Sequence, residues 1–422
     1  MTQPTNRPAV ATPRWALPIG ILILFIDGYD LFVLGAVGPS LLSYADWHAS
    51  PSTLGLLGSV TALGMPLGAF VAGRVSDTWG RRIPITVFLV WVSVCMAITG
   101  LAPNLTVFGV GRFLTGIALG ALTPLVVAFV ADWAPPARRS LHVGAALTGI
   151  ALGGMMVAIV GRAVLPELHF QWLFLVGVLP LVLVPLCWKL IPAGLPTEDR
   201  TNQLEASMPE TTPLREVFGP RLRSATLLFA TAGFFGLVLV YGASTWLPTL
   251  MIRAGYDLHS ALEFTIAFNG GAIIGTLAAT VLADRGHIKA ITVISFMCAA
   301  VAMLALSTHQ ARWLVLVMSA VAGMGALGTQ NLINAYVSQH YPARLRGTAL
   351  GVSLGLGRLG SIVGPSYLAL VTALILTPGA GFYGFVIPAV LGAVAIVLVP
   401  ARRRAQQRPQ VPTADVLAVN NP

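Results

Sequence analysis

Long apolar stretches separated by short polar segments dominate the hydropathy pattern of this chain. Each stretch approaches or exceeds the ~20 residues that an α-helix needs to cross a bilayer. We predict twelve transmembrane helices, over residues 15–40, 53–73, 83–102, 105–131, 140–161, 171–191, 224–248, 259–283, 288–307, 312–337, 346–376 and 381–400. The pattern therefore predicts an all-α membrane protein.

The longest polar segment, 192–223, divides the predicted helices six and six, and the two sides repeat each other. Pro136-Ala137-Arg138 follows the fourth span, and Pro342-Ala343-Arg344 follows the tenth. Parallel repeats of six helices are typical of one large transporter architecture. We predict four units: an N-terminal six-helix bundle (1–191), a cytoplasmic central loop (192–223), a C-terminal six-helix bundle (224–400) and a cytoplasmic tail (401–422).

Composition agrees with a chain that lipid surrounds. Of its 422 residues, 56% are hydrophobic and only 9% are charged, and the mean hydropathy is +0.82. A soluble globular protein carries roughly 25% charged residues. The lipid bilayer is therefore the expected surroundings of most of the chain.

The net charge of +10 would suit nucleic acid, but its distribution argues against such a partner. In the predicted topology, 20 of the 25 basic residues fall on one side of the membrane. This is the positive-inside bias, and it places both termini in the cytoplasm. The RRRAQQR stretch near the C-terminus is then a topological anchor rather than a binding tail.

Two carboxylates, Asp27 and Asp30, lie in the middle of the first span. A charge at the centre of a membrane helix costs about 2.5–3.5 kcal/mol even on a lenient insertion scale. Such residues usually bind a proton, an ion or a cationic partner. Because they are three residues apart, the two aspartates are expected to share one helix face.

Arg112 is a cation inside the fourth span, at a depth that differs from that of Asp30 by about one helical turn. The two side chains are therefore expected to form an ion pair. The pair either orders the bundle statically or breaks when an aspartate is protonated, which would free Arg112 for an anionic substrate.

Arg358 is a second intramembrane cation, near the middle of the eleventh span. The second half of the sequence offers it no obvious acidic partner. An arginine fork binds a carboxylate bidentately, so Arg358 is a candidate ligand for an anionic substrate. The alternative is that it donates to backbone carbonyls among the neighbouring glycines.

Several polar and aromatic side chains are predicted to line a cavity that accepts an aromatic ring and a hydroxyl group. They are Gln330, Asn331 and Asn334 on the tenth span, Asn269 on the eighth, Tyr241 on the seventh and Tyr29 on the first. The alternative for each aromatic side chain is packing against lipid.

The segment GRVSDTWGRR, residues 73–82, resembles the loop signature of the major facilitator superfamily. Asp77 lies near the end of one predicted helix, and Arg81 and Arg82 precede the next. Pairing between them would latch one state of a rocking bundle and release it in another. A degenerate copy holds Asp284 and Arg285, whereas the simpler interpretation is a solvated turn with topological arginines.

These motifs together resemble the aromatic acid:proton symporter family within that superfamily, over roughly residues 15–400. The narrower motifs are DGYD in the first span and GRLGSIVGP in the eleventh. The resemblance implies proton-coupled import of benzoate, hydroxybenzoates, protocatechuate or gentisate. It implies that Asp27, Asp30 and Arg112 matter for transport and that Asp77, Arg81 and Arg82 govern the conformational change.

We therefore predict a secondary active transporter for small aromatic acids and protons. It would be a monomer in the cell inner membrane, with no cofactor, no metal and no catalytic residues. The sequence contains no nucleophile elbow, phosphate loop or metal-ligand cluster, which excludes most enzymes. The alternatives left open are a symporter of aliphatic or sugar acids, an exporter of related anions and a membrane sensor. A sensor would require a structured output domain, which the central loop and tail do not supply.

Overall fold

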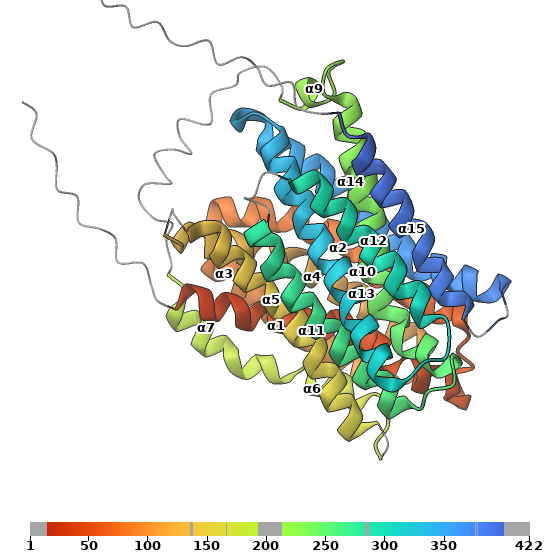
Figure 1. Cartoon of the computed structure of the whole chain (residues 1–422). Helices are drawn as coiled ribbons and strands as arrows, with labels where there is room; N and C mark the ends of the chain where they lie inside the picture. Colours follow the sequence, from red (N-terminus) through yellow and green to blue (C-terminus); the bar gives the residue numbers. More distant parts are fainter. Residues whose placement is uncertain are drawn as a thin grey trace, which may run out of the picture.

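A computed structural model shows an all-helical bundle (Figure 1). It describes residues 15–135, 138–165, 167–192, 213–282, 287–375, 377 and 379–400. Within these residues there are 12 helical segments long and apolar enough to cross a membrane, and there is no strand. The predicted twelve-span, all-α fold is therefore confirmed.

The spans are formed by long helices that follow the predicted ranges to within a few residues. In the first half these are α1 (Ala16–Ser43), α2 (Pro51–Trp79), α3 (Arg82–Gly100), α4 (Leu105–Trp133) and α5 (Arg139–Val164). In the second half they are α10 (Arg223–Arg253), α11 (Leu258–Leu282), α12 (Ile288–Leu306), α13 (Arg312–His340), α14 (Ala343–Leu374) and α15 (Ala380–Leu398).

The sixth span differs from a continuous helix. It consists of α6 (Trp172–Val176), the 3-10 helix η3 (Leu179–Leu183) and α7 (Val184–Leu190). A proline stands in the first turn of each of the last two pieces, Pro180 and Pro185. Proline lacks the backbone N–H that would continue the ladder, so each proline starts a new short helix.

Polar residues at the loop ends fix where two helices begin. Ser50 accepts a hydrogen bond from the backbone N–H of Thr53 and so caps α2, and Pro51 occupies its first turn. Asn104 accepts from the backbone N–H of Val107 and caps α4. These caps satisfy N–H groups that have no partner inside the helix.

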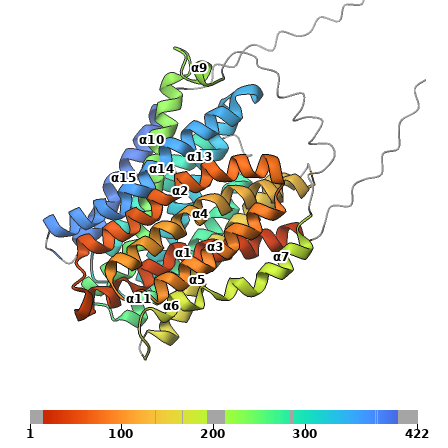
Figure 2. The same cartoon turned by 180° about the vertical axis from the view of Figure 1, so that it is seen from behind.

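The two halves of the chain lie side by side, with the red-to-yellow helices on one side and the green-to-blue helices on the other (Figure 2). Within the first half α1 packs along α5, and within the second α10 packs along α14. Gly28 allows the closest approach of α1 to α5, because a Cβ at this position would overlap the Ile150 carbonyl.

The halves contact each other mainly through the helix pairs α1 with α10, α2 with α14 and α5 with α11, and α10 also touches α2. We call the end of the bundle that carries Arg81, Arg82 and Arg344 the basic end, and the end that carries Arg162 and His259 the opposite end. Toward the opposite end the halves are closed. Arg162 on α5 donates from Nε to Nε2 of His259, in the first turn of α11, at 3.0 Å.

Helices α2 and α14 are in contact nearer the opposite end and diverge toward the basic end (Figure 2). The hydroxyls of Ser59 and Ser366 are 2.7 Å apart. Gly355 lies on the same face of α14, three turns before Ser366, yet no described atom lies within 4 Å of the position of a Cβ at Gly355. The opening is one-sided, because α5 and α11 still meet near the basic end, where Gly144 contacts Thr280.

Gly28 is packed tightly against α5, whereas Gly355 has open space around it, so a methyl group added at each should have opposite effects on stability. Gly28→Ala should lower the free energy of unfolding by about 2 kcal/mol, because the added Cβ must push α5 away. Gly355→Ala, the matched control, should leave stability unchanged or raise it by up to about 1 kcal/mol, since alanine favours a helix. Unfolding of the purified proteins in detergent measures both. Equal stability of the two variants would contradict the tight α1–α5 packing.

Candidate functional site

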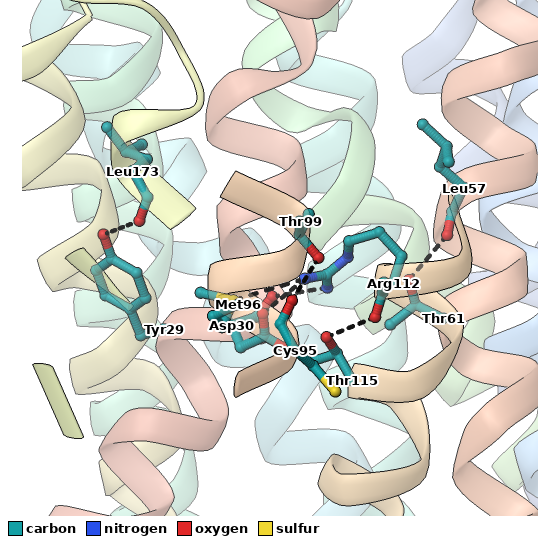
Figure 3. Close-up of polar contacts among 11 residues, drawn as sticks. Tyr29, Asp30, Leu57, Thr61, Cys95, Met96, Thr99, Arg112, Thr115 and Leu173 are labelled. Atoms are coloured by element: carbon teal, nitrogen blue, oxygen red, sulfur yellow. Dashed lines mark hydrogen bonds and ion pairs between the residues drawn. The ribbon is translucent and has the colours of Figure 1, made fainter. Parts of the chain in front are cut away.

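The most deeply buried charges are Asp30 on α1 and Arg112 on α4, which are 0% and 1% exposed. Arg112 Nη1 donates to Asp30 Oδ1 at 2.6 Å, and Nη2 donates to the Asp30 backbone carbonyl at 3.2 Å. The structure thus contains the ion pair that was predicted from the similar depths of Asp30 and Arg112 in their spans. Figure 3 shows the guanidinium reaching from α4 to α1 beside α3.

The surroundings of this pair belong entirely to the first half of the chain. The Met96 sulfur lies 3.9 Å from Arg112 Nη1, and the Phe174 ring centroid lies 5.6 Å from the guanidinium carbon. Asp30 Oδ2 and Arg112 Nε have no hydrogen-bond partner among the described residues. The pair is therefore enclosed, and it is joined through one carboxylate oxygen rather than fork to fork.

Asp27 lies one turn earlier on α1 and has different partners. It is 6% exposed, and its Oδ2 accepts a hydrogen bond from Thr123 Oγ1 on α4 at 2.6 Å. Arg358 of the other half is near enough for its charge to favour the ionised Asp27, but no hydrogen bond or salt bridge joins the two side chains among the described residues. The two aspartates share one face of α1, as predicted, because both bind side chains of α4, Asp30 to Arg112 and Asp27 to Thr123.

Arg358 lies near the middle of α14, two turns before the segment that packs on α2, and is half-buried. Among the described residues its guanidinium forms no salt bridge. It also acts electrostatically on Tyr241 of α10, whose hydroxyl lies 3.2 Å from the Met65 sulfur of α2. Through Tyr241 and Met65, α10 touches α2 where the two halves meet.

The predicted amide patch is present on α11 and α13, with each side chain in a different setting. Asn269 is 0% exposed and donates to the Thr265 carbonyl at 3.0 Å, and Asn331 donates to the Thr276 hydroxyl at 3.3 Å. The side-chain oxygens of Asn269, Gln330 and Asn334 are buried and have no partner among the described residues. Three hydrogen-bond acceptors thus remain available in this region.

Tyr29 does not join the other predicted binding residues. Its hydroxyl donates to the Leu173 carbonyl of α6 at 3.0 Å, and the ring points away from Arg112 (Figure 3). The cause is its position on α1, since a residue adjacent to both Gly28 and Asp30 must face a third direction. In this structure Tyr29 joins α1 to the broken sixth span.

The loop signature folds differently from a simple turn, because α2 continues to Trp79 and only Gly80, with φ of 71°, and Arg81 separate it from α3. Arg81 Nε donates to Asp132 of α4 at 3.1 Å and also contacts the Ser76 hydroxyl. The Arg82 guanidinium lies over the Trp188 ring at 4.2 Å.

The predicted latch partners cannot all be placed. The side chain of Asp77 and the residues Asp284 and Arg285 lie outside the described residues. What the structure adds is Asp132, which Arg139 also approaches at 3.8 Å. An acid of α4 therefore occupies the position next to Arg81 that the sequence analysis assigned to Asp77 alone.

Thr123 and Asp132 are functional candidates that the sequence analysis did not assign. Thr123 lies eleven residues, or three helical turns, after Arg112, so both side chains are on one face of α4. This spacing relative to a predicted intramembrane cation was a usable signal. Met65 gave no such signal, because a methionine in an apolar span is ordinarily a packing residue.

The fold and the buried charges at its centre define a multi-pass membrane protein of the transporter class. The profile of the Major Facilitator Superfamily matches residues 20–365. The chain belongs to the major facilitator superfamily, as the motifs predicted, and is thus a transporter rather than an enzyme.

Known relatives match nearly the whole chain. A gentisate transporter of Corynebacterium glutamicum is 37% identical over 90% of this chain and 86% of its own length. A benzoate transport protein of Acinetobacter baylyi is 31% identical over 94% of this chain and 91% of its own length. The crystal structure of a D-xylose–proton symporter has a TM-score of 0.74 at 17% identity, covers 92% and 97% of the two chains, and supports the fold alone.

The enclosed ion pair makes a stability prediction. Asp30→Asn and Arg112→Met should each lower the free energy of unfolding by about 3 kcal/mol, because each leaves one buried charge unpaired. The double variant should lose clearly less than the sum of the two single losses. Chemical unfolding in detergent measures this, with Glu263→Gln, which breaks the exposed pair with Arg312, as a control of small effect. Additive losses would show that the two charges do not stabilise each other.

Proposed function

We propose that this protein takes up small aromatic carboxylates together with protons by alternating access. The substrates would be of the benzoate, hydroxybenzoate, protocatechuate or gentisate class. Two relatives that span most of the chain are named as transporters of gentisate and benzoate. The observation that carries the proposal is a buried carboxylate, Asp27, in the middle of a membrane helix, with no cation bound to it among the described residues.

The chemistry follows from charge balance. With Asp27 ionised, its carboxylate offsets the charge of Arg358, and the centre of the protein is neutral. When Asp27 binds a proton, Arg358 loses that counter-charge and an aromatic carboxylate can replace it, so the centre is neutral again. A buried uncompensated charge is costly, so proton and anion binding favour each other.

This balance also explains how the anion can be accumulated. Import of one anion against a negative-inside membrane potential costs about 2.3 kcal/mol per 100 mV. One proton carried with one carboxylate moves no net charge, which removes this cost. The proton gradient then drives accumulation.

The remaining side chains are assigned roles around this exchange. Arg358 would bind the carboxylate, since it is half-buried and lacks a salt bridge among the described residues, whereas Arg112 is already held by Asp30. Asp30 and Arg112 would fix α1 against α4. Tyr241 and the acceptors of Gln330, Asn334 and Asn269 would contact the ring and its substituents.

The basic end would face the cytoplasm under the positive-inside rule, with both termini there and the monomer in the cell inner membrane. The divergence of α2 and α14 would then open the protein toward the cytoplasm. Arg81, which binds Asp132 in this state, would change its partners when this end closes, and Asp77, Arg82, Asp284 and Arg285 would take part in the latch of the closed state.

Proton coupling is tested by uptake into proteoliposomes with an imposed proton gradient and labelled gentisate, 4-hydroxybenzoate or benzoate. Asp27→Asn should reduce gradient-driven accumulation by about tenfold or more, since the coupled proton has no site, while substrate exchange across the membrane persists. The exposed acid Asp46, which binds the Tyr44 hydroxyl, provides the control variant Asp46→Asn with wild-type uptake. Full accumulation by Asp27→Asn would refute Asp27 as the proton carrier.

Substrate binding by Arg358 is tested separately, by equilibrium binding of the same acids in detergent. Arg358→Gln should weaken binding by about 10- to 100-fold, because it removes a charge-assisted hydrogen bond. The affinity of Arg358→Lys should lie between those of the wild type and Arg358→Gln, since lysine keeps the positive charge but lacks the planar guanidinium fork. Arg312→Gln, at the opposite end, should bind normally. Unchanged affinity in Arg358→Gln would transfer the carboxylate site to another residue.

A further inference from the structure

One hydroxyl group in the centre of the protein has two acceptors and only one proton. Thr123 Oγ1 lies 2.6 Å from Asp27 Oδ2 and 3.3 Å from the backbone carbonyl of Leu119, one turn earlier on α4. A threonine hydroxyl donates one hydrogen bond and can accept others. The short distance to Asp27 and the long one to Leu119 indicate that the proton of Thr123 points at the carboxylate here.

The arrangement can reverse when Asp27 is protonated. A protonated Asp27 carries its own O–H and must donate it. Thr123 Oγ1 can then accept that hydrogen bond and turn its own proton to the Leu119 carbonyl. Threonine hydroxyls in helices commonly donate to the carbonyl four residues earlier, so this second position is an ordinary one.

The other charged or titratable groups that act on Asp27 cannot serve a protonated carboxyl in this way. Arg358 of α14 has only donors. Asp30, on α1 itself, is held by Arg112 of α4 at 2.6 Å. The Tyr241 hydroxyl of α10 is directed to the Met65 sulfur at 3.2 Å. Among these groups, Thr123 alone offers a neutral oxygen at hydrogen-bond distance from Asp27.

We propose that Thr123 is a positioning residue for proton coupling, whose hydroxyl donates to ionised Asp27 and accepts from protonated Asp27. Each proton taken up stays on Asp27 Oδ2, and the Thr123 proton only changes acceptor, so no group gains or loses an additional proton. Both states of the carboxyl are thereby hydrogen-bonded where water is scarce. The proposal rests on the proposed function, because it assigns Asp27 as the proton carrier.

The test compares pH profiles of gradient-driven uptake for Thr123→Val and Thr123→Ser. Valine keeps the shape of the side chain and removes the hydroxyl. A hydrogen bond to an ionised group is worth more than one to a neutral group, so the ionised form of Asp27 loses more. The pH of half-maximal uptake should therefore move up by about one unit in Thr123→Val. Thr123→Ser should restore the wild-type profile.

Thr115 provides a matched control on the same helix. It is fully buried, and its hydroxyl donates to the Gly111 carbonyl, four residues earlier, at 2.8 Å. Thr115→Val therefore removes the same kind of intrahelical hydrogen bond without touching Asp27, and its pH profile should match that of the wild type. Substrate exchange at fixed pH should persist in Thr123→Val, because exchange requires no proton release.

Three results separate the outcomes. The role of Thr123 is refuted if the pH profile of Thr123→Val matches that of Thr115→Val. It is also refuted if the pH of half-maximal uptake moves as far in Thr123→Ser as in Thr123→Val. If the wild type shows no gradient-driven uptake of any aromatic acid, the proposed function fails first and the role of Thr123 falls with it. If Thr123→Val does not fold, Thr123→Ala gives the same comparison.

Discussion

The requirement that every buried charge be matched governs the centre of this protein. Two aspartates and two arginines lie near the middle of membrane helices, Asp27 and Asp30 on α1, Arg112 on α4 and Arg358 on α14, where an unpaired ion is poorly solvated. The structure matches them in two different ways. Asp30 and Arg112 are in direct contact inside one half. Asp27 and Arg358 belong to different halves, so their interaction depends on how the halves are arranged.

This difference separates a structural pair from a conditional one. The enclosed pair joins α1 to α4 whatever the second half does. The conditional pair senses the other half, and it can be replaced by any combination of proton and anion with the same total charge. Arg358 lies two turns, about 10 Å, before the part of α14 that packs on α2. Arg358 therefore lies near the place where the halves begin to separate.

The sequence was sufficient for the features that lipid imposes directly. Twelve spans follow from hydropathy because lipid demands long apolar helices, and the Asp30–Arg112 pair followed from depth along two spans. The break in the sixth span was missed because its residues are uniformly apolar, although Pro180 and Pro185 were visible. The bond between Asp27 and Thr123 was not predicted, although it follows from the same shared faces of α1 and α4. The proximity of Arg358 to Asp27 depends on packing between halves, which no local periodicity encodes.

Gly351 and Gly355 form an uncovered strip on α14, and this strip has a consequence for the thermodynamics of a conformational change. Gly351 and Gly355 have no described neighbour within 4 Å of a Cβ position. Ordering long side chains at a closing interface costs up to about 2 kcal/mol each in lost rotamer freedom, whereas glycine has no rotamers to lose. If α2 closed onto this strip, backbone would meet backbone with almost no side-chain entropy penalty. The two states would then differ little in free energy, and a single bound ligand would be enough to change which one is populated.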